Sequence, residues 1–309
     1  LGNNASTGVD FDGTIYNVGS GGDITITSTS SGQAITMGSD GATTVKTANG
    51  TINFDTGTIS TAHNLDISSA GGAISINAVR GSGTATSLTV NADSGTTNTE
   101  TISIGLIGSG NEIGAVTLDG ADGVTLKGNI TLADAALADL DIDGKAYISG
   151  DVTITTDNAD HDGIIDFSTT IDGVTEGTPI DDNLVILAGD SAGTQGGSLL
   201  LGGIIGGGVH LDSLKINATD GDLGFNVPQI GDGTNAGVSG VTQIGNSLTT
   251  NDIVFTGQTY DFGGNVTVTG DGGANAFQFT GTDPITFTSA GNVLFTGTGD
   301  DFVKLADLK

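Results

Sequence analysis

The sequence predicts an all-β protein whose short strands stack as the coils of a parallel β-helix, or solenoid. Three observations favour this class. Apolar and polar residues alternate in short segments, 54 of the 309 residues are glycine, and only 5% are aromatic. Alternation gives each strand one buried face and one solvated face. β-Branched residues are abundant and good helix formers are scarce, which disfavours helices.

Alternating segments follow one another along the whole chain. In each of them Ile, Val, Leu or Phe takes every second position, and Thr, Ser, Asn or Asp takes the positions between. The clearest are DITIT (23–27), TINFD (51–55), NLDIS (64–68), AISIN (73–77), SLTVN (87–91), AVTLD (115–119), DVTIT (151–155), SLKIN (213–217), NVTVT (265–269) and PITFT (284–288). Asp-Gly pairs, such as Asp40-Gly41 and Asp122-Gly123, supply the positive-φ turns between them.

Uniform short strands favour a solenoid over a sandwich or a barrel, because those folds close around one core. A solenoid extends its core by adding coils, each with two or three strands. At roughly 20–25 residues per coil and ~4.8 Å per rung, the chain predicts about 13 coils in a rod on the order of 60 Å long.

Internal similarity supports a repeat architecture. Residues 64–123 align with 151–221, and 258–305 form a partial third copy. We therefore expect residues 1–309 to be one continuous β-helix segment, part of a longer chain. The least regular stretch, 226–251, is either a projecting recognition loop or a coil with weakly patterned strands.

The charge of the chain is strongly one-sided. The chain has 7 Lys and Arg but 36 Asp and Glu, which gives a formal net charge of −29, and it has no cysteine. Such a chain repels phosphate backbones and anionic membrane surfaces, so we expect no nucleic-acid partner. No apolar run approaches the ~20 residues of a membrane span, so we expect no membrane insertion. The acidity is typical of a surface that keeps neighbouring molecules apart, with cation binding as the alternative.

Several segments resemble a known class of repeats. The related elements at 147–157 and 260–271 share Tyr, Gly and a V-T-(I/V)-T run, and 164–173 and 276–299 have similar composition. These segments resemble repeats of large bacterial exoproteins of the filamentous haemagglutinin-like class. The resemblance implies a right-handed parallel β-helix, export to the cell surface, and an adhesive or structural role.

The stretch LAGDSAG (187–193) matches the Gly-x-Ser-x-Gly elbow of serine hydrolases around Ser191. An elbow requires a following helix, and the glycine-rich residues 194–208 disfavour one. His210 is the only histidine after Ser191. The similar turn NADSGTT (91–97) lacks the elbow, so we predict a turn here and no catalytic residue anywhere in the chain.

A second motif has oxygen ligands at alternate positions. Asn158, Asp160 and Asp162, followed by Gly163 and Asp166, match the first part of a calcium loop. Thr169 stands where such a loop has its bidentate Glu. We therefore expect a solvated turn, with a weak Ca²⁺ site as the alternative, and no other cofactor.

The sequence favours a secreted, non-enzymatic β-helical rod on the bacterial cell surface, acting as an adhesin or a filament-forming structural protein. Its expected partners are other copies or neighbouring parts of a longer chain, stacked end to end, and a cell surface or glycan. Two alternatives stay open: a polysaccharide-acting β-helix enzyme, either lyase or glycosidase, and a Ca²⁺-dependent surface-layer or matrix protein.

Overall fold

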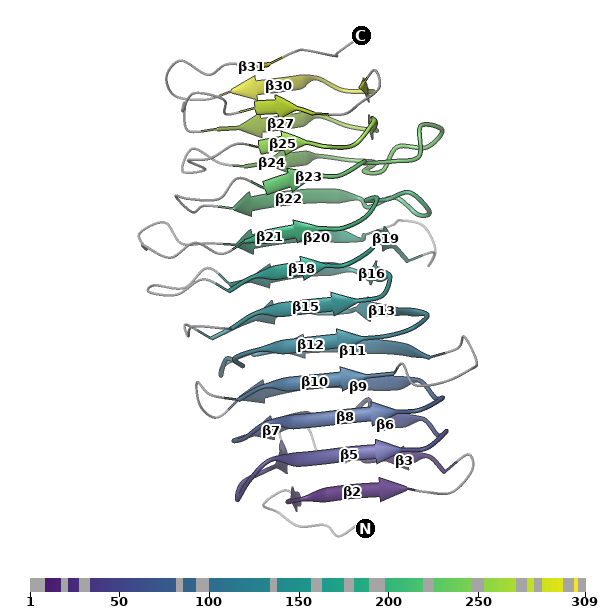
Figure 1. Cartoon of the computed structure of the whole chain (residues 1–309), viewed down its shortest axis with the longest axis vertical. Coiled ribbons are helices and arrows are strands. Elements are labelled where there is room, and N and C mark those ends of the chain that lie inside the picture. Colours follow the sequence, from purple (N-terminus) through teal and green to yellow (C-terminus); the bar gives the residue numbers. More distant parts are fainter. Residues whose placement is uncertain are drawn as a thin grey trace.

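The computed structural model is a parallel β-solenoid built entirely from strands (Figure 1). It describes residues 9–17, 22–27, 34–81, 86–92, 100–133, 138–156, 163–174, 181–188, 198–218, 225–245, 253–270, 277–280, 285–296 and 303–304. Every strand pairing among them is parallel, which confirms the predicted fold class. These residues include no helix long and apolar enough to cross a membrane.

Each coil contributes to three walls. The first wall is an eight-stranded sheet that a four-stranded sheet continues (Figure 1). Its strands are β2 (Thr14–Asn17), β5 (Thr43–Thr47), β8 (Leu65–Ser69), β10 (Leu88–Asn91), β12 (Val116–Asp119), β15 (Leu140–Asp143), β18 (Ile165–Phe167) and β21 (Leu199–Leu201), then β23 (Phe225–Val227), β25 (Ile253–Phe255), β28 (Phe277–Phe279) and β31 (Val303–Lys304).

The other two walls share a 17-stranded sheet, because the long strands β9 and β11 turn the corner between them. The second wall holds β3 (Ile24–Thr25), β6 (Ile52–Phe54), β13 (Gly123–Leu126), β16 (Ala146–Ile148) and β19 (Ile171–Gly173), continued by the pair β26 (Thr259–Phe262) and β29 (Thr286–Ser289). The third holds β1 (Val9–Phe11), β4 (Ala34–Met37), β7 (Thr58–Thr61), β14 (Ile130–Thr131), β17 (Asp151–Thr155), β20 (Asn183–Ala188), β22 (Ser213–Ala218), β24 (Thr242–Ile244), β27 (Val266–Thr269) and β30 (Val293–Thr296); β9 (Ile74–Gly81) and β11 (Thr101–Ile107) belong to both.

First-wall strands run one way across the front of the rod, and third-wall strands return behind them as the chain rises, which makes the coil right-handed (Figure 1). The chain forms fewer coils than the thirteen expected. Successive first-wall strands begin 23 to 34 residues apart over β8 to β21, for example at Leu65, Leu88 and Val116. Longer turns therefore use residues that the estimate assigned to further coils.

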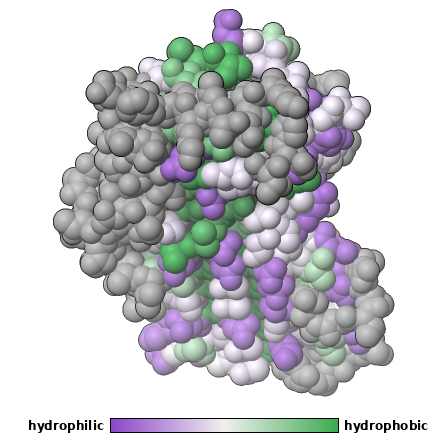
Figure 2. Space-filling view, turned by 45° about the horizontal axis from the view of Figure 1, so that its top comes forward, coloured by the Kyte–Doolittle hydropathy of each residue, from purple (hydrophilic) through white to green (hydrophobic). Residues whose placement is uncertain are grey.

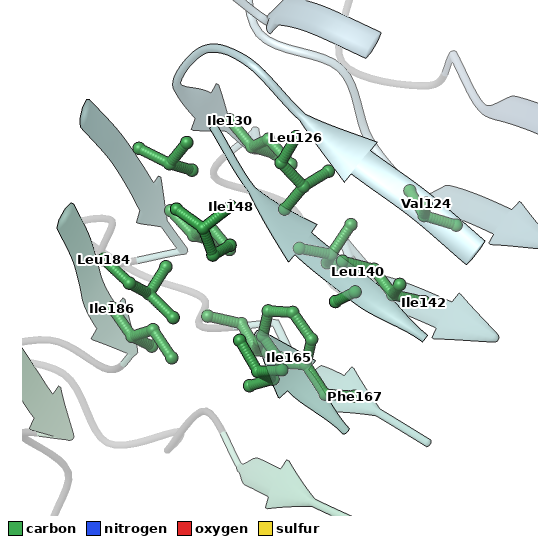
Figure 3. Close-up of a cluster of buried hydrophobic side chains, with 14 of the residues drawn as sticks. Val124, Leu126, Ile130, Leu140, Ile142, Ile148, Ile165, Phe167, Leu184 and Ile186 are labelled. Carbon is green, nitrogen blue, oxygen red and sulfur yellow. The ribbon is translucent and has the colours of Figure 1, made fainter. Parts of the chain in front are cut away.

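The core is a set of apolar columns, because alternation places the same face of every strand inside. One column runs through Val45, Ile67, Val90, Leu118 and Ile142, all fully buried. Side chains from all three walls meet at the axis (Figure 3). The solenoid therefore keeps one continuous core without a large packed layer.

The aligned sequence copies do not all fall on the same walls. Val152 and Val266 occupy one column of the third wall, four rungs apart, as their alignment implies. The strand at 115–119 lies in the first wall, whereas its sequence counterpart at 213–217 lies in the third. Similar sequence here reflects similar strand and turn chemistry, and the duplication itself stays a prediction.

The segment 226–251 is part of the stack over its described residues. Ile230 and Val238 bridge to Tyr260 and Phe262 of the next coil. Between them lies an exposed turn at 232–235, held by Asp232, which accepts hydrogen bonds from the backbone of Thr234 and Asn235. Whether this turn recognises a partner stays a prediction.

Candidate functional site

A groove crosses the outer surface where β9 and β11 turn from the second wall into the third. Two adjoining hollows of about 570 Å³ each share Leu106. The first is lined by Asp55, Ser75, Ile76, Asn77, Ser103, Gly105, Leu106 and Lys127, and the second by 106–112, Asn129, Thr131 and Ala133. The lining residues come from four successive coils, so the groove runs along the rod axis.

The floor of the groove depends on a glycine. A Cβ on Gly105 would lie 1.9 Å from the carbonyl oxygen of Asn77 on the preceding rung. The two backbones therefore approach more closely than any side chain allows, and the surface stays hollow at the corner. The next residue, Leu106, is 41% exposed. It points outward because the alternation of inward and outward side chains changes phase where the wall turns.

Two asparagines in the groove have one end fixed by backbone. The Asn77 side-chain amide donates to the carbonyl oxygen of Gly57 at 2.9 Å, and Asn129 Oδ1 accepts from the backbone N–H of Thr153 at 2.9 Å. Asn77 thus keeps its amide oxygen for another partner, and Asn129 keeps its NH₂ group. Ser75 donates to Asp55 at the end of the groove.

A second feature is a group of carboxylates on the first wall. Asp141 and Asp166 face outward on adjacent rungs, as do Asp119 and Asp143, and the rungs are ~4.8 Å apart. Burial raises the pKa of Asp141, and the nearby Asp143 raises it further. Burial also raises the pKa of Asp166, with Asp141 and Asp143 adding to the effect. Like charges here favour a proton or a cation.

Of the predicted calcium ligands, only Asp166 lies in the described part of the chain, so the calcium site stays a prediction. Asp166 lies outward on β18, whereas Asn158, Asp160 and Asp162 lie outside the described residues. Among the residues that the structure describes, no group of three or more His, Asp or Glu is arranged to hold a metal ion. The neighbours of Asp166 are Asp141 and Asp143, which the sequence analysis missed. A signal was present, because LDID (140–143) and IDF (165–167) alternate in the same phase.

A buried carboxylate ties the corner between the second and third walls. Asp172 is 2% exposed and forms a 2.7 Å ion pair with Lys145. It also accepts a hydrogen bond from the Gly208 N–H at 3.0 Å. The hydrogen bond with Asp172 raises the pKa of Lys145. The Lys145 ammonium also lies 5.1 Å from the centre of the Tyr147 ring. These contacts fix a turn, and they use both oxygens of the carboxylate.

The rejected serine-hydrolase motif falls largely outside the described residues. Ser191 lies outside the described residues, and so does His161. His63 Nδ1 contacts the carbonyl oxygen of Gly38 at 2.6 Å, and His210 lies in a turn many coils away. Because Ser191 lies outside the described residues, the turn predicted there stays a prediction.

The C-terminal coils end in exposed apolar strands. Val293 and Leu294 of β30 are 40% and 54% exposed, and hydrophobic residues show at this end of the molecule (Figure 2). Among the described residues, β30 pairs only with β27. Within the described ranges, one edge of β30 therefore has no paired strand.

Comparison with known proteins gives no relative of this chain: no family model, no curated protein and no solved structure matches it.

Proposed function

We propose that the chain is a secreted, non-enzymatic β-helical rod of the bacterial cell surface, an adhesin or a filament-forming structural protein. The observation that supports this most is the unbroken parallel ladder of the third wall from β1 to β30. The ladder joins every coil to the next by backbone hydrogen bonds and a shared core.

A rod of this kind works mechanically. Each coil contacts only its neighbours, so stiffness along the axis comes from repeated backbone pairing. Turns between the walls project sideways and present side chains at a distance from the point of attachment. The acidic surface keeps rods apart laterally, while the open edge at β30 invites continuation along the axis.

End-to-end association is the form of assembly that this geometry favours. An edge strand offers unpaired N–H and C=O groups to another chain, or to a further part of its own. Contact between unlike ends does not close on itself and propagates as a fibre. The resemblance to filamentous haemagglutinin-like repeats supports a role outside the cell.

The test is to image the chain and measure its self-association. Negative-stain microscopy is expected to show straight rods that join end to end as concentration rises. Leu294→Glu places a charge at the open edge and is expected to shift association to at least ~10-fold higher concentration. The matched control is Val241→Glu, which changes a residue that is 60% exposed elsewhere on the rod. Compact particles, or equal effects of the two variants, would contradict the proposal.

A further inference from the structure

We propose that the groove over β9 and β11 binds a neutral oligosaccharide chain lying along the rod axis. Such binding deepens the proposed adhesive role, on which it rests for its biological setting. The groove follows the axis because its lining side chains come from consecutive rungs, as with Ser75 and Ser103. Each sugar ring extends a chain by about one rung spacing, ~4.8 Å. Two successive rings therefore meet the hydroxyls of Ser75 and Ser103, which are register partners.

The polar groups in the groove match sugar hydroxyls, which both donate and accept hydrogen bonds. Asn77 presents a free amide oxygen, and Asn129 presents a free NH₂ group. Because backbone partners already hold both amides, ordering them on binding costs little additional entropy. Ser103 and Thr131 add hydroxyls along the same line.

The middle of the groove also offers an apolar contact. Leu106 is shared by both hollows and is 41% exposed. Sugar rings combine polar edges with C–H faces, so one ring can cover Leu106 while its hydroxyls reach the neighbouring polar side chains. A ligand that is polar throughout leaves this surface wet.

Charge favours a neutral ligand over an acidic one. Asp55 and Glu112 lie in opposite hollows of the groove, and the exposed Lys127 contributes a single positive charge. With a formal net charge of −29 on the whole chain, a polyanionic glycan is repelled at long range. Carboxylates accept hydrogen bonds from neutral hydroxyls without this penalty.

A peptide fits the groove less well. Extended peptides bind β-proteins chiefly by adding a strand to an open edge. The strands under the groove have no such edge, because β9 and β11 each pair with strands on both sides. Recognition therefore depends on side chains, which here are mostly neutral hydroxyl and amide groups.

The test measures binding of defined probes to the whole chain by calorimetry and by NMR. The neutral probes are cellotetraose, maltotetraose and the tetramer of N-acetylglucosamine. The acidic probe is tetragalacturonate, and the peptide probe is an alternating Val-Thr octapeptide. We expect at least one neutral tetramer to bind and the other two kinds of probe to bind at least ~10-fold more weakly. Preference for the acidic sugar or the peptide, or binding of none, would overturn the proposal.

Variants then locate the binding. Asn129→Asp keeps the oxygen that accepts from Thr153 and removes the free NH₂ group, so affinity should fall ~5–10-fold with the melting temperature little changed. Asn77→Ala should give a similar loss. The control Asn226→Ala changes an exposed asparagine on the first wall and should bind as the parent does. Unchanged affinity in both groove variants would refute the assignment.

The outcomes separate this inference from the proposed function. If the chain forms rods that bind none of the neutral probes, the proposed rod function is kept and the proposed groove ligand is rejected. If the chain forms compact particles that bind a neutral tetramer in the groove, the groove ligand is kept and the rod function is rejected.

Discussion

The middle coils and the C-terminal coils fill the same three-walled frame with different side chains. From β5 to β18 the core is aliphatic apart from Phe54 and Phe167. From β25 to β30 it becomes aromatic: Phe255 lies 5.2 Å from Tyr260 and 4.8 Å from Phe279, measured between ring centres. The middle coils have neighbours on both sides, whereas in the part of the chain that the structure describes β30 is paired on one. Bulky rings thus concentrate burial where the stack has fewer neighbours.

The largest expected effect comes from removing one buried phenylalanine ring in each region. Phe167→Ala and Phe255→Ala should each cost about 3–5 kcal/mol of unfolding free energy. Phe255 also contacts Tyr260, Phe279, Phe287 and Phe295, so its loss should release the last coils first. Hydrogen exchange should show faster exchange confined to β25–β30 in Phe255→Ala. If both variants unfold as one unit, the two regions do not differ in cooperativity.

The next effect concerns the polar corner of the middle coils. Asp172→Ala should cost about 2–3 kcal/mol in urea unfolding, because Lys145 loses its partner and the Gly208 N–H is left without one. Solvent screens part of the ion pair, because the Lys145 side chain is 38% exposed. Asp151→Ala, at an exposed carboxylate that accepts from Asn183, is the control and should change stability by less than about 0.5 kcal/mol.

A smaller effect tests the Tyr260 hydroxyl, which lies inside the aromatic region. Tyr260 Oη donates to the carbonyl oxygen of Val227 at 2.9 Å and accepts from the Gly257 N–H at 2.6 Å. Burial raises the pKa of this phenol well above its usual value. Tyr260→Phe leaves the Gly257 N–H unpaired, whereas the Val227 carbonyl still accepts from the Thr256 N–H at 3.0 Å, so the variant should lower the unfolding free energy by about 1–2 kcal/mol. A neutral result in urea unfolding would mean that water replaces the hydroxyl.

The smallest effect is a stabilisation. Asp141 and Asp166 have pKa values raised above 3.8 in the folded chain, so their ionisation opposes folding at neutral pH. Asp166→Asn should therefore raise stability at pH 7 by less than about 1 kcal/mol. The gain over the parent should vanish as pH falls through the raised pKa toward 3.8. Melting curves from pH 4 to 7 check this, with Asp66→Asn, next to Thr89 in the same column, as the control.

The sequence predicts the strands well because alternation alone decides which side chains are buried. Leu88 and Val90 of SLTVN are fully buried, and Ile285 of PITFT is buried. The wall to which a strand belongs and the length of each coil depend on turns, and turn chemistry such as Asp-Gly occurs on every wall. This explains both the excess of expected coils and the alignment of strands that lie on different walls.

The sites are harder to predict than the strands. Asp166 could be singled out from its own motif, but its neighbour Asp141 lies 25 positions earlier and becomes adjacent only through strand register. Asn77 and Asn129 look like any polar residues on a solvated strand face. Their distinction comes from a hollow created by the backbone contact at Gly105, which no local pattern encodes.

The bridge at Asp172 joins three successive coils, since Lys145 precedes β16, Asp172 lies in β19, and Gly208 belongs to the following coil. Elsewhere a solenoid can lose one end coil at a time, each loss breaking contacts with a single neighbour. Here detachment of the coil that holds Gly208 also exposes an ionised carboxylate that two coils share. Unwinding that starts at the C-terminal end therefore meets an additional cost at this corner, which protects the coils before it.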